Sequence, residues 1–347
     1  MGAGAGVAAA SPASPASPAG AASWRPGSLG SAGETTAVTG VRAGGITTEF
    51  AFVYDYSQHW MFVRVNGGTW KLGKGPGLAK GEMVVGATAL SASRLFVFTN
   101  LADHTSRVLA DNGGTWTLVV KFRSPIGSMS VLSPVNIWVF GSPRHYTTGG
   151  IGVWRYNGTS WRVVLANGNS GAAVSATSAW AHTGTVVDHL AGGKWTRHSL
   201  ASLIPPSGSG VRSLIGVYPT SATTAYAVGS GGADGPIVVL QYDGHRWTRA
   251  ATYPSGIVPF ATDVASDGKG GLLMGGTTAA GGNGMLLHYV KGSGKIVAES
   301  VTGMTNVPRS GFLSVAKVPG TAVNILGGQV PAQGTLTGSK PTVYTSN

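Results

Sequence analysis

Short apolar stretches alternate with glycine-rich turns along most of this chain. The clearest unit is VLADNGGTWTLVV (108–120), which reads as an apolar strand, an Asn-Gly turn and a second strand that begins at Trp116. Gly and Asn tolerate the positive φ that such tight hairpin turns require. Weaker copies occupy 63–73, 153–165, 186–199 and 238–251. The pattern predicts a repeated β-hairpin in which the Trp covers its own turn.

The Trp that follows the turn recurs at intervals of about 45 residues. It is found at Trp24, Trp70, Trp116, Trp161, Trp195 and Trp247, and Ile296 takes its place in the next unit. The interval before Trp195 is shorter, which predicts a compressed fourth unit around 175–185. Each unit divides into four short strands, for example 127–132, 136–142, 152–157 and 160–165 in the third. Four strands repeated at this period are typical of a β-propeller.

The two ends of the chain decide the number of blades. Residues 311–347 supply only three strands, whereas the stretch ASWRPGS (22–28) offers one strand without partners. Pairing the two would complete a last blade and remove an exposed sheet edge. We therefore predict an all-β, seven-bladed β-propeller of four-stranded blades over residues 22–347, with the last blade closed by the N-terminal strand.

Composition agrees with short strands and tight turns and adds limits on chemistry. The 347 residues include 56 Gly and only 10% charged residues. Cys is absent, which excludes disulfides, zinc-thiolate sites, cysteine nucleophiles and galactose-oxidase-type copper chemistry. No segment reaches the roughly 18 apolar residues of a membrane span, and we expect a monomer.

Residues 1–21 differ in composition from everything that follows. An Ala/Gly run passes into Ser-Pro-Ala repeats, MGAGAGVAAASPASPASPAGA. This is typical of the end of an export signal followed by a disordered spacer, and the alternative is a low-complexity tail without a targeting role. We expect export, and hence a position outside the cell or at the cell surface.

The stretch DNGGTW (111–116) resembles the Asp-box, through Asp111, Gly113, Thr115 and Trp116, although Leu109 stands where that family usually has Ser or Thr. The double glycines of LLMGG (272–276) and of NILGG, which ends at Gly328, resemble kelch repeats, as in central domains of the galactose oxidase type. The chain thus resembles secreted bacterial seven-bladed propellers. The resemblance implies a fold and no particular activity, because these motifs are scaffold devices of enzymes and binding proteins alike.

An enzymatic reading finds little support in the residues. The stretch FRSP (122–125) is similar to the Phe-Arg-Ile-Pro motif of sialidases, but it follows the best Asp-box rather than preceding it. None of the four Glu residues lies in a convincing nucleophile context. The eight His residues are dispersed, and strand alternation turns neighbours such as Asp188 and His189 to opposite faces. We predict no catalytic residues, no metal and no cofactor, with a secreted glycan hydrolase or lyase as the alternative.

Charge and loop placement suggest a binding role. The net charge of +12 attracts polyanions, but no run of basic residues is longer than two, so we expect no nucleic-acid site. Loops joining second to third strands emerge on the same face as loops between blades. We call this the mouth face and predict a ligand site there of aromatic, His and Arg side chains, namely Tyr56, His59, His104, Arg123, Arg144, His145, Tyr146, Arg212 and Arg309.

We therefore expect an exported, non-enzymatic binding or interaction module. Its partner would be a polysaccharide or another surface polyanion, or else a protein. Two further alternatives remain at this stage: the loops are polar only because they are exposed, or the propeller is a structural domain whose partner binds the blade sides.

Overall fold

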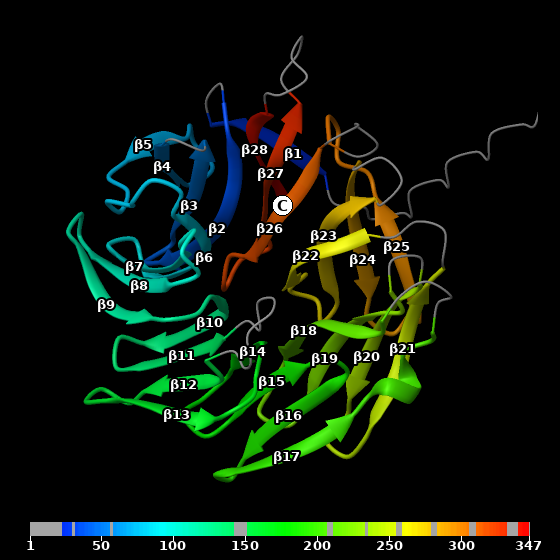
Figure 1. The fold of residues 1–347 in the computed structure, drawn as a ribbon. Helices are drawn as coiled ribbons and strands as arrows, with labels where there is room; N and C mark the ends of the chain where they lie inside the picture. Colours follow the sequence, from blue (N-terminus) through cyan, green and yellow to red (C-terminus); the bar gives the residue numbers. More distant parts are fainter. Residues whose placement is uncertain are drawn as a thin grey trace, which may run out of the picture.

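The computed structural model describes residues 23–29, 32–55, 58–141, 151–206, 211–232, 235–254, 259–278, 283–304, 310–331 and 339–346. These residues form seven four-stranded antiparallel sheets arranged in a ring (Figure 1). The predicted β-propeller of seven blades is confirmed. In each blade the first strand lies innermost, along a central channel, and the fourth lies at the circumference.

The first four blades follow one another directly along the chain. Blade 1 comprises β2 (Glu34–Ala43), β3 (Ile46–Asp55), β4 (Gln58–Val65) and β5 (Lys71–Gly73). Blade 2 comprises β6 (Met83–Ser91), β7 (Arg94–Asn100), β8 (Ser106–Asn112) and β9 (Trp116–Phe122). Blade 3 comprises β10 (Ile126–Ser133), β11 (Asn136–Gly141), β12 (Val153–Tyr156) and β13 (Trp161–Leu165). Blade 4 comprises β14 (Ser170–Ala173), β15 (Ala179–Thr183), β16 (Val186–Ala191) and β17 (Lys194–Ser199).

The remaining blades follow a short 3₁₀ helix, η1 (Ala201–Leu203). Blade 5 comprises β18 (Ser213–Pro219), β19 (Ala225–Ser230), β20 (Ile237–Tyr242) and β21 (Trp247–Tyr253). Blade 6 comprises β22 (Pro259–Ser266), β23 (Leu272–Thr278), β24 (Gly284–Val290) and β25 (Lys295–Glu299). Blade 7 comprises β26 (Gly311–Lys317), β27 (Asn324–Pro331), β28 (Ser339–Ser346) and β1 (Trp24–Ser28).

Blade 7 joins the two ends of the chain, as predicted. Its strand order is β26-β27-β28-β1, and β1 pairs antiparallel with β28 from Trp24 opposite Ser346 to Ser28 opposite Thr342 (Figure 1). The amide of Gly33 adds a hydrogen bond of 2.9 Å to the carbonyl of Ser339. The sheet edge that β28 would otherwise expose is therefore covered by the N-terminal strand.

The strands predicted in the third unit agree with the structure to within about two residues, the usual uncertainty of element boundaries. The compressed fourth unit is confirmed as well, since β15 and β16 are joined by only Gly184 and Thr185. In the hairpin that contains Asp111, Gly113 and Gly114 adopt φ values of 69° and 91°. The carboxylate of Asp111 accepts the Gly114 amide at 2.7 Å and so caps this turn.

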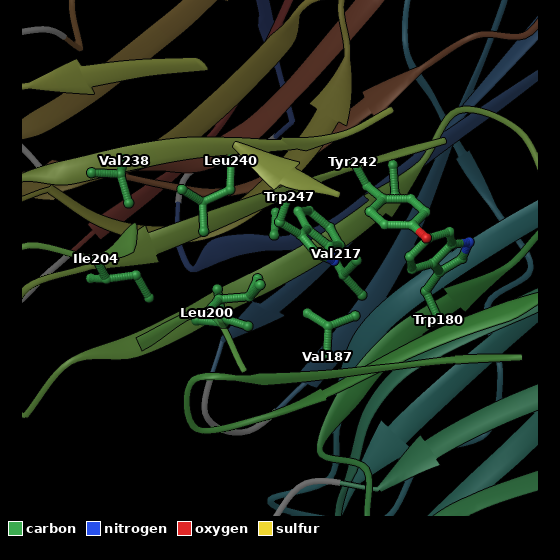
Figure 2. Close-up of a cluster of buried hydrophobic side chains, with 12 residues drawn as sticks. Trp180, Val187, Leu200, Ile204, Val217, Val238, Leu240, Tyr242 and Trp247 are labelled. Carbon is green, nitrogen blue, oxygen red and sulfur yellow. The ribbon is translucent and has the colours of Figure 1, made fainter. Parts of the chain in front are cut away.

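The hydrophobic core lies at the seams between adjacent blades. Figure 2 shows one such cluster, in which side chains of blades 4 and 5 interdigitate with those of the intervening connection. Its labelled members are Trp180, Val187, Leu200, Ile204, Val217, Val238, Leu240, Tyr242 and Trp247. Six comparable clusters lie elsewhere among the described residues. Each blade is thus stabilised by its two neighbours rather than by a core of its own.

The repeated Trp side chains cover these seams in addition to packing on their own hairpins, where Trp161 and Trp247 contact Tyr156 and Tyr242 on the paired strand. The indole NH of Trp116 donates to the Lys74 carbonyl, beyond blade 1, at 2.8 Å. The ring of Trp161 lies edge-on to Phe122 of blade 2, with centroids 5.8 Å apart. Because the Trp lies at or near the start of the outermost strand, its large ring can reach the preceding blade as well as its own hairpin.

The inner strands hold the ring together through hydroxyl groups. The Ser314 hydroxyl of β26 accepts the Val38 amide of β2 at 3.1 Å, and the Ser130 hydroxyl of β10 accepts the Ala173 amide of β14 at 3.0 Å. Six of the seven inner strands, all except β14, also carry a register shift that bends the strand locally. The hydroxyl hydrogen bonds link neighbouring inner strands, and the register shifts bend these strands around the channel.

Candidate functional site

The mouth face carries the connections from second to third strands and from blade to blade. Four of the nine predicted site residues, His59, His104, Arg123 and Arg212, belong to the described chain. The other five lie outside the described residues: Tyr56, Arg144, His145, Tyr146 and Arg309.

The four described residues share the mouth face but differ in setting. His59 is half-buried and stacks on Tyr54, with ring centroids 5.1 Å apart, and burial lowers its pKa. His104 is exposed in a turn at a φ of 65°, and Arg123 is exposed directly after β9. Arg212 instead donates from Nη1 to the carbonyls of Ala201 and Ile204, at 2.9 and 3.4 Å, and holds η1 in place. The mouth site as a whole stays a prediction.

A cavity of about 440 Å³ lies in the central channel, which the sequence did not reveal as a site. It is bounded by the inner strands β2, β6, β10 and β26 and by Phe98 of β7. Most of the lining is apolar or small. Glu34 contributes the carboxylate and Thr36 a hydroxyl group.

Most other carboxylates in the described chain form ion pairs or hydrogen bonds that stabilise the fold. Five of the twelve acidic residues pair with a basic side chain in the contacts Glu49–Arg64, Glu82–Arg107, Asp188–Arg197, Asp267–His288 and Glu299–His288. Asp103, Asp111 and Asp243 accept backbone amides within their own turns. These eight groups serve local structure, and so they are poor candidates for the acid and base of a glycosidase.

The densest polar network lies at the seam of blades 6 and 7. His288 of β24 contacts Asp267 through Nε2 at 2.9 Å and Glu299 through Nδ1 at 2.7 Å. Glu299 also accepts the indole NH of Trp24 at 3.1 Å, while the Lys317 ammonium lies 3.4 Å from the Asp267 carbonyl. Burial alone would lower the pKa of His288, but hydrogen bonds to both carboxylates raise it to about 9.

This network ties both edges of blade 7 to blade 6, because Trp24 belongs to its outermost strand and Lys317 to its innermost. Each ring nitrogen of His288 faces a carboxylate, so neither is left to act as a base toward a ligand. Within the described ranges, no three His, Cys, Asp or Glu side chains gather in a way that could hold a metal ion. We therefore assign the network to the scaffold.

Basic side chains occupy the circumference of the ring. Each of the seven outermost strands carries at least one exposed Lys or Arg, and Glu299, which is buried, is the single acidic residue in these strands. The basic residues are Arg25, Lys71, Lys121, Arg162, Lys194, Arg197, Arg249 and Lys295. We call this set the outer basic ring.

The outer basic ring borders a groove between blades 7 and 1, with a volume of about 700 Å³. Arg25 lines it from β1, and the guanidinium of Arg64 lies 4.9 Å from the centre of the Trp70 ring on the blade 1 side. Trp70 packs against Gly27, where a Cβ would come within 2.7 Å of the indole nitrogen. Thr47, Thr69 and Thr345 add hydroxyl groups to the lining, and Glu49 adds a buried carboxylate that is paired with Arg64.

Comparison with known proteins shows similarity of fold and no close relative. No family model matches the sequence, and neither does any curated protein sequence. The structure of YCF48 bound to D1 peptide is similar with a TM-score of 0.57, at 13% identity over 93% of this chain and 96% of that chain. The WD40 β-propeller domain of Doa1 gives 0.56, at 11% identity over 94% and 96% of the two chains.

A third similar structure is the extracellular domain of the putative hybrid two-component system BT4673 from B. thetaiotaomicron. Its TM-score is 0.61, at 11% identity over 94% of this chain, which spans 39% of the length of that one. At such identities the likeness establishes a propeller and nothing about a ligand. The described residues contain no helix that is both long and apolar enough to cross a membrane.

Proposed function

We propose that this propeller is an exported, non-enzymatic binding module that captures an anionic surface polymer through the outer basic ring. The observation that carries the proposal is the placement of an exposed cation on every outermost strand, with no exposed acid among them. A circumference of one sign attracts a polyanion from any direction and offers an extended chain several contacts at once.

The groove between blades 7 and 1 is the anchor of this proposal. Arg25 lines the groove and Lys71 follows the groove residue Trp70 at the start of β5, so we expect one chain of carboxylates to meet both. Arginine adds paired hydrogen bonds to a carboxylate, and the threonine hydroxyls suit sugar hydroxyls. The composition of residues 1–21 supports export. The peptide bound to YCF48 shows that a propeller of similar fold serves as a binding domain, so an acidic protein segment is a second source of the same chemistry.

Binding of an anionic polysaccharide tests the proposal. The double variant R25Q/K71Q should weaken binding of alginate at least tenfold, because it removes two exposed cations at the groove and on the strand beside it, and the remaining cation, Arg64, is already paired with Glu49. A matched double variant, R123Q/K80Q, removes two exposed cations outside the outermost strands and should change the affinity less than twofold. Neutral dextran should not bind to either form.

Two outcomes would contradict the proposal. Equal losses in the two double variants would show that net charge alone attracts the polymer, which moderate salt would then abolish. A larger loss in R123Q/K80Q would place the ligand on the mouth face instead. Basic side chains on outermost strands also prevent edge-to-edge sheet pairing, so light scattering must show that the variants remain as dispersed as the parent protein.

A further inference from the structure

The cavity in the central channel is chemically the opposite of the outer basic ring. Its volume of about 440 Å³ lies in the range of small-molecule sites. The lining includes Val38, Met83, Val85, Phe98, Met129 and Val315. Glu34 is the single titratable side chain among the described residues that line it. The lining also holds the hydroxyl groups of Thr36, Thr88, Ser128 and Ser314, so the cavity combines apolar side chains with hydroxyl groups and one acidic group.

Glu34 differs from the other three Glu residues of the chain. Glu49, Glu82 and Glu299 each contact Arg or His. No hydrogen bond or ion pair is formed by the half-buried Glu34 carboxylate in the described structure, and burial raises its pKa with no cation to oppose the shift. A partly desolvated carboxylate without a cation is costly to the protein, and a ligand that supplies the missing cation relieves this cost.

Thr36 provides a second polar group without a partner. Its side chain is only 8% exposed, and its hydroxyl oxygen has no hydrogen-bond partner among the described residues. Thr36 lies two residues after Glu34 on β2, and both line the cavity. The pairing of β2 with β3 shifts register between Thr35 and Ala37, so Thr36 lies at an irregular point of the strand rather than in its regular alternation. An ammonium group, which has three N–H donors, can donate to the carboxylate and to the hydroxyl at the same time.

We propose that the central channel binds a small organic cation, an amine with an apolar body, whose ammonium group pairs with Glu34. The ammonium donates to the carboxylate, and the apolar body packs against Met83, Met129 and Phe98, whose flexible or flat side chains adapt to an irregular ligand. A neutral apolar ligand leaves the carboxylate unpaired, and an anion is repelled by it. This site is independent of polymer binding at the circumference, because the two attract opposite charges.

Binding of an ammonium group at this site should be coupled to the release of a proton. Burial favours the protonated form of Glu34, whereas a bound ammonium favours the ionised form. Binding therefore releases a proton near the pKa of the free site, and affinity rises with pH across that range. Since no other titratable side chain is found in the described lining, replacing Glu34 should remove both effects.

Titration calorimetry with 2-phenylethylammonium tests the proposal, with 2-phenylethanol as the uncharged probe of equal shape. We expect the amine to bind to the parent protein at least tenfold more tightly than the alcohol. E34Q should weaken amine binding at least tenfold and leave alcohol binding unchanged. T36V should weaken it a few-fold. D55N is the matched control, because Asp55 ends β3 outside the cavity lining, and it should bind as the parent protein does.

Calorimetry in two buffers of different ionisation enthalpy should show proton release for the parent protein and none for E34Q. Equal affinity for amine and alcohol would overturn the proposal, as would equal losses in E34Q and D55N. Absence of amine binding by the parent protein at millimolar concentration would overturn it as well. E34Q retains the shape of the side chain, and an unchanged melting temperature shows that its effect concerns the ligand. T36V, which keeps the Glu34 charge, tests the same cavity independently.

Discussion

Two histidines in this propeller are held in opposite protonation states. His182 is buried, and desolvation lowers its pKa to about 4, whereas the carboxylates of Asp267 and Glu299 overcome burial at His288 and raise its pKa to about 9. His182 is therefore neutral and His288 charged at pH 7. Differences of this size between folded and unfolded pKa values make stability depend on pH.

The His288 contact should stabilise the fold fully below about pH 6.5 and lose its effect as pH rises through 9. The folded pKa is raised, so the folded protein holds a proton that the unfolded chain releases across this window. In H288Q the melting temperature should be several degrees lower than in the parent protein at pH 6 and close to it at pH 10. Differential scanning calorimetry from pH 5 to pH 10 measures the melting temperature across this whole window.

His182 provides the control for this experiment. Its folded pKa is depressed, so its contribution is present above about pH 6.5 and is lost as pH falls toward 4. In H182L the melting temperature should therefore fall less steeply as pH drops from about 6.5 toward 4 than it does in the parent protein. Its decrease between about pH 6.5 and 9 should be unchanged. A loss of stability at alkaline pH that persists unchanged in H288Q would contradict the His288 interpretation. Lys317, which also borders the network, cannot account for such a loss, because desolvation lowers its pKa and its contribution to stability therefore increases as pH rises.

Single strands were predictable from the sequence wherever their signal is local. The Gly113-Gly114 turn and the strands of the third unit, β10 to β13, depend on backbone conformation and on residues a few positions apart. The direction of each Trp was not predictable, because Trp116 reaches a carbonyl 42 residues earlier in the chain. That contact depends on how the blades pack, which no single repeat encodes.

The polar sites depend even more strongly on contacts between residues that are far apart in the sequence. Asp267, His288 and Glu299 meet Trp24 from the other end of the chain, a separation of 275 residues between Glu299 and Trp24. Glu34 lies in a strand whose sequence contains no motif. That its carboxylate lines the channel without a basic partner depends on four inner strands that are far apart in the sequence. The sequence places the mouth residues in loops, where no pattern fixes the direction of a side chain, and four of the nine belong to the described chain.

The closing strand β1 offers a direct test at the level of one element. Trp24 packs with Leu273 and Leu286 of blade 6 and donates to Glu299, so β1 serves the seam as well as the sheet. Deleting residues 1–29 should lower the melting temperature by about 10 °C, from the lost Trp burial and the exposed edge of β28. Deleting residues 1–18 should change it by less than about 2 °C.

A synthetic peptide of residues 22–30 should restore part of the stability lost on deletion of 1–29, since the edge of β28 remains available for pairing. Scanning fluorimetry with increasing peptide concentration measures this rescue. Identical melting temperatures for the two truncated proteins would contradict closure by the N-terminal strand.

At the level of the whole molecule, the seams make each blade depend on both neighbours. Trp247 lies on the seam of blades 4 and 5, where it is 9% exposed and its ring centroid lies 5.9 Å from that of Trp180 (Figure 2). Trp24 lies on the seam of blades 6 and 7 and is equally buried. A ring has no free end at which unfolding begins, so damage at either seam should weaken the entire structure.

We expect W247A and W24A each to lower the urea midpoint of a single unfolding transition of the whole ring. Truncating a buried Trp costs about 3 to 5 kcal/mol, and no blade has a core of its own that would keep it folded. Far-UV circular dichroism, which reports all the strands, and tryptophan fluorescence, which reports the seams, should give coincident curves in urea for both variants. T248A, an exposed outermost-strand change next to Trp247, is the control and should shift the midpoint little. Two separated transitions in W247A, with blades 1 to 3 still folded after the first, would mean that the seams divide the ring into independent units rather than joining it into one.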